Sequence, residues 1–328
     1  MPEIDRKHVA ILRVLERAER PLGAGKVAKE LLSHGVELTE RAVRYHLEYM
    51  DRLGLTEPMG RPGRRITDAG RRELAEARVA DKSSLVFAHL EAFAYETTFD
   101  VETGRGRVAV NVSLLPADAG RQALRVMRPV LNSRMATSRR IRIYQPGEWV
   151  GNQVVPRDSV GIGTVCSVTI NGILLKRGIP VQSLFGGLLA IESHTPRRFT
   201  EMVHYGWTSL DPIVVFIKSH STSVTQVMAT GTGIIGASFR EFPTVARSEA
   251  MSVLEKIIPW GLSGVVAVGS PSCPLFEVEV GPGRCGMVIS AGLNPIAAVE
   301  EARIPTRSHA MAAVEDFEHL TDINELSL

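Results

Sequence analysis

The 328-residue sequence contains only three cysteines, Cys166, Cys273 and Cys285, and no two of them form a C-x-x-C pair. Its nine histidines include no H-E-x-x-H pair. A disulfide framework and a zinc site are therefore not expected, because both need such residues at regular spacings. No apolar run approaches the roughly 20 residues that cross a bilayer, and residues 1–5 lack the basic and apolar regions of a signal peptide. The sequence thus predicts a cytoplasmic protein with no metal and no membrane partner.

Motifs of common catalytic sites are also missing. The sequence has no G-x-S-x-G elbow, no P-loop, and no G-x-G-x-x-G that follows a strand and has an acidic partner. Cys166 lies in an apolar run, which is more typical of a small core residue than of a nucleophile. We therefore predict neither a catalytic residue nor a cofactor.

The positive charge is concentrated near the N-terminus, although the net charge of +2 is small. Residues 1–82 carry 17 Lys/Arg and 14 Asp/Glu, and residues 60–72 hold five arginines against one acidic residue, Asp68. A local basic excess of this kind is modest support for contact with nucleic acid.

Residues 38–65 are typical of a recognition helix followed by a wing. Thr39 suits an N-cap, and Val43, Leu47 and Met50 recur at the spacing of one helical face. The Gly/Pro/Arg-rich stretch 60–65 then predicts a short hairpin. Helices are also expected before this stretch, at 24–33 and around 8–15, and after it, where Thr67 caps a fourth helix that runs to about residue 80. This order resembles the winged-helix domains of bacterial and archaeal repressors. We therefore predict a winged helix-turn-helix domain over residues 1–82, with a linker at 81–84.

The predicted helix and wing would contact double-stranded DNA in different ways. Arg41 or Arg44, one turn apart on the helix, can read a base edge, while the wing arginines reach the backbone. The predicted DNA-binding residues are Thr39, Arg41, Arg44, Tyr45, Arg61, Arg64 and Arg65. The alternative is a solvated amphipathic helix with an ordinary basic loop.

Residues 83–328 contain an internal repeat. Gly104, Gly106, Pro116, Ala123 and Val126 recur 127 residues later, and Gly161, Ile179, Pro180 and Ser183 recur 125 residues later. We therefore predict an α+β domain made of two similar halves, at about 104–192 and 231–317, related by a pseudo-twofold axis. Each half would contain a strand (108–114; 234–239), a Pro-started helix (117–131; 244–258), a strand (140–144; 264–268), another strand (165–170; 276–280 or 287–290) and a closing helix.

The stretches VGIGTVCSVTINGILLKRGIPVQSLFGGLLAIE and RRFTEMVHYGWTSLDPIVVFI resemble the regulatory domain of the NrpR family of transcriptional repressors. In that family, one or two such domains follow an N-terminal winged helix. The resemblance implies a homodimeric DNA-binding repressor of nitrogen regulation whose small-molecule effector is 2-oxoglutarate.

The stretch 161–166 predicts a glycine turn that leads into an apolar strand. Such a turn can offer backbone N–H groups to a carboxylate, although it can equally be a plain tight turn. The predicted effector-binding residues are Gly161, Gly163, Thr164, Thr169 and Asn171.

Two other functions stay open from the sequence. An enzyme of unknown activity with a winged-helix accessory domain would need a catalytic constellation in residues 83–328. A winged helix that makes only protein contacts would be favoured by a neutral recognition helix.

Overall fold

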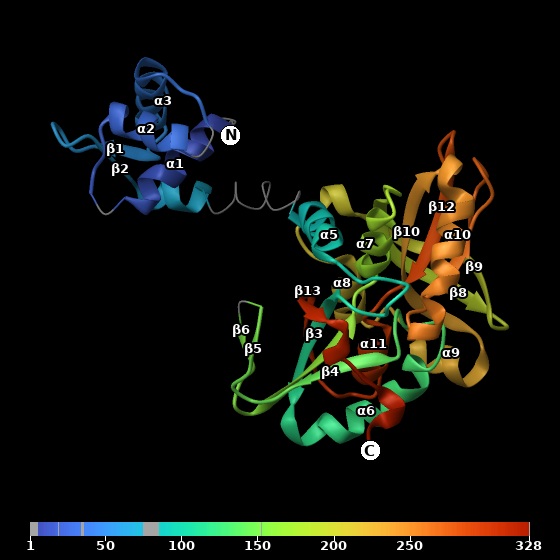
Figure 1. The fold of residues 1–328 in the computed structure, drawn as a ribbon. Coiled ribbons are helices and arrows are strands. Elements are labelled where there is room, and N and C mark those ends of the chain that lie inside the picture. Colours follow the sequence, from blue (N-terminus) through green and yellow to red (C-terminus); the bar gives the residue numbers. More distant parts are fainter. Residues whose placement is uncertain (1–5, 19, 34–35, 75–84, 152, 328) are drawn as a thin grey trace. The chain divides into compact units, whose positions relative to one another are not determined.

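The computed structural model describes residues 6–18, 20–33, 36–74, 85–151 and 153–327. The chain divides into two compact units, Met1–Lys82 and Ser83–Leu328, here called the N-terminal and the C-terminal unit (Figure 1). The predicted linker at 81–84 lies outside the described residues.

The N-terminal unit is a winged helix-turn-helix, as predicted. Its elements are α1 (Arg6–Arg17), α2 (Ala24–Ser33), α3 (Glu40–Arg52), β1 (Thr56–Pro58), β2 (Arg64–Ile66) and a further helix described over residues 68–74. The strands β1 and β2 form an antiparallel hairpin with Glu57 opposite Arg65.

The local signals of the sequence account for these elements. The Thr39 hydroxyl accepts a hydrogen bond from the Ala42 N–H at 3.2 Å and thus caps α3. The predicted stripe Val43, Leu47 and Met50 is fully buried against the other helices. Thr67 caps the next helix by accepting from the Gly70 N–H at 3.0 Å.

The C-terminal unit begins with α5 (Leu85–Glu96) and continues with two halves that have the same order of elements. The first half is β3 (Arg107–Pro116), α6 (Gly120–Leu131), β4 (Arg140–Tyr144), β7 (Ser159–Val165), α7 (Val168–Lys176) and β8 (Gln182–Glu192). The second half is β10 (Gly233–Pro243), α10 (Arg247–Lys256), β11 (Val265–Val268), β12 (Arg284–Ser290), α11 (Asn294–Glu301) and β13 (Arg307–Asp316). The predicted α+β fold with two similar halves is confirmed.

Other elements connect the halves or extend them. β9 (Thr195–His204), α8 (Pro212–Lys218) and α9 (Val224–Thr230) lie between the two halves in sequence. β5 (Trp149–Val150) and β6 (Gln153–Val154) form a small hairpin, and β14 (Thr321–Asp322) follows the second half.

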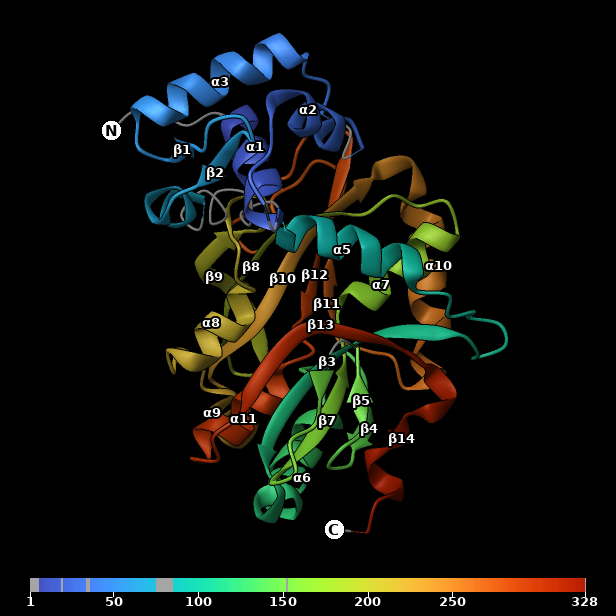
Figure 2. The same cartoon turned by 90° about the vertical axis from the view of Figure 1, so that its left-hand side faces the viewer.

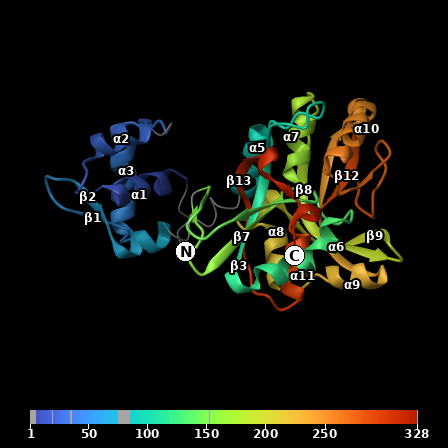
Figure 3. The same ribbon diagram turned by 60° about the horizontal axis from the view of Figure 1, so that its bottom comes forward.

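The two halves exchange their last strands. One antiparallel sheet has the order β13-β3-β7-β4-β14, and the other has the order β11-β12-β10-β8-β9 (Figures 2 and 3). Strand β8 of the first half thus pairs with β10, and β13 of the second half pairs with β3. Neither half completes a sheet alone, so the two halves have to fold as one unit.

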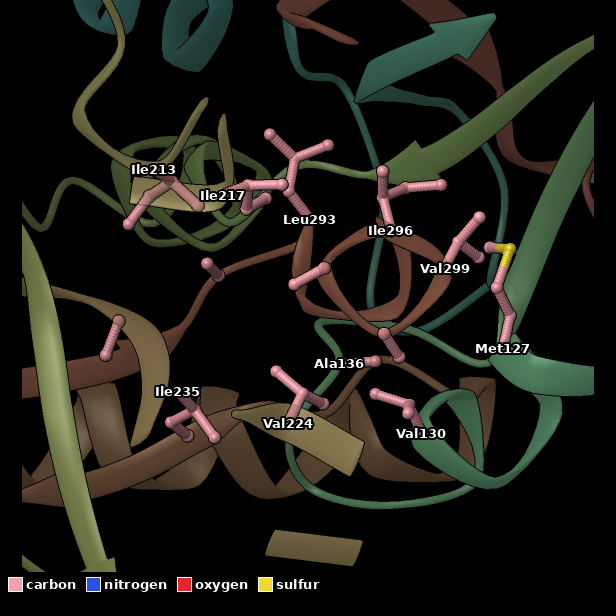
Figure 4. Close-up of a cluster of buried hydrophobic side chains, with 14 of the residues drawn as sticks. Met127, Val130, Ala136, Ile213, Ile217, Val224, Ile235, Leu293, Ile296 and Val299 are labelled. Atoms are coloured by element: carbon pink, nitrogen blue, oxygen red, sulfur yellow. The ribbon is translucent and has the colours of Figure 1, made fainter. Parts of the chain in front are cut away.

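The helices of the two halves share two hydrophobic cores. One core contains α6 and α11 together with α8 and α9, and Figure 4 shows Val299 of α11 beside Met127 of α6. The other core contains α7 and α10. Each core therefore receives one helix from each half.

One predicted strand of the first half is misplaced. The predicted strand at 165–170 is wrong, because the strand β7 ends at Val165 and α7 begins at Val168. In the second half, the predicted strand at 287–290 is confirmed by β12, whereas residues 276–280 form no strand. The reason is that every residue from Val168 to Leu174 is buried. A helix buried on all sides has no 3.6-residue periodicity that distinguishes it from a buried strand.

Candidate functional site

The exposed face of α3 carries three of the predicted DNA-binding side chains. Arg41, Arg44 and Tyr45 all lie on the solvent side, with Tyr45 65% exposed. Arg44 forms an ion pair with Glu40 at 2.8 Å, and both side chains are more than half exposed. Such an exposed pair is weak in water, so Arg44 can leave it for a phosphate or a base. The Thr39 hydroxyl is already engaged as the cap.

The wing arginines differ in their surroundings. Arg61 lies at the tip, between β1 and β2, and forms no ion pair within the part of the chain that the structure describes. Arg65 pairs with Glu57 across the hairpin at 2.7 Å and stays exposed. Arg64 turns inward and donates from Nε to Asp51 at 2.8 Å, with only about a fifth of either side chain exposed. The prediction that Arg64 contacts DNA is therefore revised, because its guanidinium already binds the end of α3.

The predicted glycine turn at 161–166 does not exist. Gly161, Gly163 and Thr164 lie inside β7, in ladders with β3 and β4 on either side. A Cβ at Gly163 would come within 2.9 Å of the Tyr144 ring, so these glycines make room for Tyr144. Backbone groups that pair with two neighbouring strands are not available to a carboxylate. The structure thus removes the geometric basis for placing the effector at this stretch.

Thr169 and Asn171 lie on the buried side of α7 and have different partners. The Thr169 hydroxyl accepts from the N–H of Ala109 at 3.1 Å and so ties α7 to β3. Asn171 donates to Ser183 at 2.9 Å and accepts from Arg240. Of the five predicted effector-binding residues, only Asn171 contacts a charged side chain.

Arg240 of β10 is fully buried and is the centre of a polar cluster. Its Nη1 donates to the Ser167 carbonyl at 2.8 Å and to Asn171 Oδ1, and its Nη2 donates to the hydroxyls of Ser167 at 2.7 Å and Ser238 at 3.2 Å. All these acceptors are neutral, and no carboxylate of the described ranges forms an ion pair with Arg240. We call Arg240, Ser167, Asn171 and Ser238 the Arg240 cluster.

Sequence reasoning missed Arg240. The predicted strand ended at residue 239, one position before it. The available signal was the charged pair Arg240 and Glu241 between Phe239 and Phe242, in the otherwise uncharged run IIGASFREF.

Two cavities adjoin the cluster. Ser167 and Ser238 line a cavity of about 20 Å³, together with Tyr205 and Asp211, which we call the small cavity. Asn171 lines a cleft of about 440 Å³, which is bordered by α5, α7 and β8. Arg240 therefore has hydrogen-bond partners in the walls of both cavities.

Burial shifts the pKa values of the titratable groups around the small cavity. Burial raises the pKa of Asp211, although its carboxylate accepts the N–H groups of Ile213 and Val214. Burial also raises the pKa of the Cys166 thiol to about 11 and raises that of Tyr205 further above its usual value. Burial also lowers the pKa of Arg240, and a bound anion would favour its charged form.

Both halves of the C-terminal unit supply the cluster. Ser167 lies between β7 and α7 of the first half, and the corresponding Gly292, between β12 and α11 of the second half, also lines the small cavity. Ser238 and Arg240 come from β10. The strand exchange thus places the cluster at the junction of the halves.

In the described ranges, no three His, Cys, Asp or Glu side chains gather as a metal site. Likewise, no helix among the residues that the structure describes is long and apolar enough to cross a bilayer.

Comparison with known proteins identifies both units. Residues 84–322 match the family described as NrpR regulatory domains NRD1 and 2, and residues 9–74 match the Ribonuclease R winged-helix domain. The global nitrogen regulator NrpRI of Methanosarcina mazei is 35% identical over 98% of this chain and 99% of its own length. The global nitrogen regulator NrpR of Methanocaldococcus jannaschii is 30% identical, and this chain spans 55% of that protein.

A solved structure agrees with these sequence relatives. The crystal structure of a nitrogen repressor-like protein from Methanococcus jannaschii superimposes with a TM-score of 0.63 and 26% identity, covering 73% of this chain and 98% of that one. The chain therefore belongs to the NrpR family of nitrogen-responsive transcriptional regulators.

Proposed function

We propose that this protein is a DNA-binding repressor and that it binds its operator through α3 and the wing. The support is the placement of Arg41, Arg44 and Tyr45 on the solvent face of a capped helix, with Arg61 at the tip of the adjacent hairpin. A helix of this kind enters the major groove while the wing reaches neighbouring phosphates. The names of the relatives, which describe nitrogen regulators and a repressor-like protein, support the same function.

The C-terminal unit, in this proposal, binds a small anionic effector at the Arg240 cluster. The main support is that Arg240 is fully buried, yet every atom that accepts a hydrogen bond from it is neutral. A buried charge without a counter-charge is costly, and a ligand carboxylate would remove that cost through charge-assisted hydrogen bonds. The effector suggested by the family resemblance, 2-oxoglutarate, has two carboxylates and fits this chemistry.

The proposal includes a homodimer, because winged-helix proteins commonly read two half-sites related by a twofold axis. Effector binding would then lower DNA affinity by favouring a dimer with a different spacing of its recognition helices. Such couplings are typically about 1–3 kcal/mol, which corresponds to a change in affinity of about 5- to 150-fold. The absence of catalysis stays a prediction.

The test combines two measurements on the full-length protein. Duplexes selected from a random pool by the protein define an operator, and its affinity is measured with and without 2-oxoglutarate. Titration calorimetry with 2-oxoglutarate, up to about 10 mM to reach weak millimolar binding, measures the effector directly. Binding heat together with weaker operator binding supports the proposal. If the protein selects no sequence from the pool, the proposed operator recognition is wrong. If the titration gives no heat, 2-oxoglutarate is not the effector.

A further inference from the structure

We propose that α5 is a lid over the Arg240 cluster and that its displacement transmits effector binding to the N-terminal unit. This inference rests on the effector site proposed above. The buried face of α5 consists of Val86, Leu90 and Ala94. It packs on an apolar seat formed by Cys166, Val168, Tyr205 and Met311.

Leu90 lies between the two cavities of the cluster. Its side chain is 5% exposed and lines both the small cavity of about 20 Å³ and the cleft of about 440 Å³. The small cavity has room for about one water, since a water needs roughly 10–15 Å³ of such space. A dicarboxylate is larger than this space, and displacement of Leu90 would join the small cavity to the cleft and let the ligand reach Ser167, Ser238 and the Arg240 guanidinium.

Three other residues in the wall of the small cavity are held by hydrogen-bonded elements. Asn111 belongs to β3 and Ser238 belongs to β10, and each strand is paired on both sides. Asp211 is held as the N-cap of α8 by two backbone N–H groups. Moving any of these walls would break directional bonds and leave buried polar groups unpaired.

By contrast, α5 is held by apolar contacts. From Val86 to Glu96, no side chain hydrogen-bonds to another element of the described C-terminal unit, and the closest polar interaction is Lys176 over the Tyr95 ring at 5.0 Å. Apolar contacts are not directional, so α5 can shift on its seat without leaving a polar group unpaired. It is therefore the wall that moves at the lowest cost.

A shift of α5 would affect the N-terminal unit because of where α5 lies in the chain. The boundary between the units falls between Lys82 and Ser83, and α5 begins at Leu85. It is thus the first element of the C-terminal unit, and the point at which the N-terminal unit is attached moves with it. In a dimer, such a shift changes the separation of the two recognition helices, which is the distance that a twofold operator selects.

The test loosens α5 in two ways. Leu90→Ala removes the side chain between the cavities. Val86→Ala weakens the same apolar contacts at a residue that does not line the small cavity. If the closed lid is the DNA-binding form, both variants should bind 2-oxoglutarate about 10-fold more tightly or better, because less work is needed to open the lid. Both should also bind the selected operator more weakly in the absence of effector. Glu96→Ala, at an exposed position of α5 that lines neither cavity, is the matched control and should behave as the wild type.

This pair of opposite changes separates the lid from a structural defect, since a damaged fold would weaken both affinities. Amide hydrogen exchange on the wild-type protein adds a direct measurement, in which 2-oxoglutarate should speed exchange in α5. Unchanged operator affinity in both variants would overturn the inference. If titration of the wild type with 2-oxoglutarate gives no binding heat, 2-oxoglutarate is not the effector. The operator affinities of the variants then still show whether α5 controls DNA binding.

Discussion

Arg64 of β2 and Asp51 of α3 form the ion pair that fixes the wing to the recognition helix. The Arg64 Nε lies 2.8 Å from Asp51 Oδ2, and the Thr56 hydroxyl of β1 donates to the other oxygen of the same carboxylate. Both strands of the hairpin are thus bound to one side chain near the end of α3. The wing arginines therefore divide into Arg64, which positions the hairpin, and Arg61, which faces solvent.

We predict that Arg64→Ala and Arg61→Ala have different effects. Arg64→Ala should lower the free energy of unfolding of the N-terminal unit by about 1–2 kcal/mol, because it leaves Asp51 without its charged partner. Arg61→Ala should leave stability unchanged and weaken binding to every sequence about equally, with a salt dependence smaller by about one ion. Thermal unfolding and binding at several salt concentrations check both. Equal losses of stability in the two variants would contradict this division.

Sequence preference is predicted to depend on the α3 face. Arg44→Ala should cost about 1–3 kcal/mol in operator binding and relax the preference at one base pair, and Arg41→Ala should act similarly at another. Glu48→Ala, on the exposed side of the same helix, is the control. Competition among selected duplexes measures the preference. Wild-type affinity and preference in both arginine variants would show that this helix does not read the bases.

The Arg240 cluster is predicted to serve ligand binding more than stability. Arg240→Gln should reduce the affinity for 2-oxoglutarate more than about 10-fold, because the ligand loses its counter-charge. The free energy of unfolding should fall by only about 1–3 kcal/mol, because removal of an unpaired buried charge partly offsets the lost hydrogen bonds to Ser167, Asn171 and Ser238. Arg284→Gln, in the wall of the cleft, is the control for charge near the site. Titration calorimetry measures these affinities. If Arg240→Gln keeps the wild-type affinity for 2-oxoglutarate, the effector binds at another site.

The glycines of β7 are predicted to affect packing. Gly163→Ala should lower the free energy of unfolding by about 1–3 kcal/mol, because the new Cβ would meet the Tyr144 ring at 2.9 Å. The affinity for effector should stay unchanged in the fraction that is folded. The control is Gly23→Ala, because a Cβ at Gly23 would meet no atom within 4 Å. Gly147 also has free space around it, but its positive φ would strain an alanine. A selective loss of effector binding in Gly163→Ala would restore a direct role for this strand.

Acid sensitivity is predicted to depend on Glu300. Burial raises its pKa, but bonds to Lys218 and to the hydroxyl and N–H of Thr306 outweigh this effect, so its pKa is lowered overall. A carboxylate with a lowered pKa stabilises the fold above the pKa of the unfolded state, and this contribution is lost as the pH falls through the folded pKa. Glu300→Gln should therefore destabilise the protein near pH 7 by about 1–3 kcal/mol, and the difference from wild type should shrink below about pH 4. Glu255→Gln, which is exposed, should show neither effect in urea unfolding across this pH range.

The sequence by itself determined the elements whose signals are local. The cap at Thr39, the stripe of Val43, Leu47 and Met50, and the turn residues of the wing specify the N-terminal fold without reference to distant contacts. The recurrence of residues at offsets of 127 and 125 likewise indicated two similar halves. In these cases the information lies within a few residues or in the comparison of one stretch with another.

The tertiary structure alone decided three other features. It placed residues 168–174 in a helix, because a segment buried on all sides has no amphipathic pattern. It turned Arg64 toward Asp51, which depends on where a hairpin meets a helix. It also brought Arg240 to Ser167 and Asn171, some 70 residues earlier in the chain, because β8 and β13 cross between the halves and close the sheets around the cluster. Long-range strand pairing of this kind leaves no local signal, since the side chains that meet are chosen by the register of distant strands.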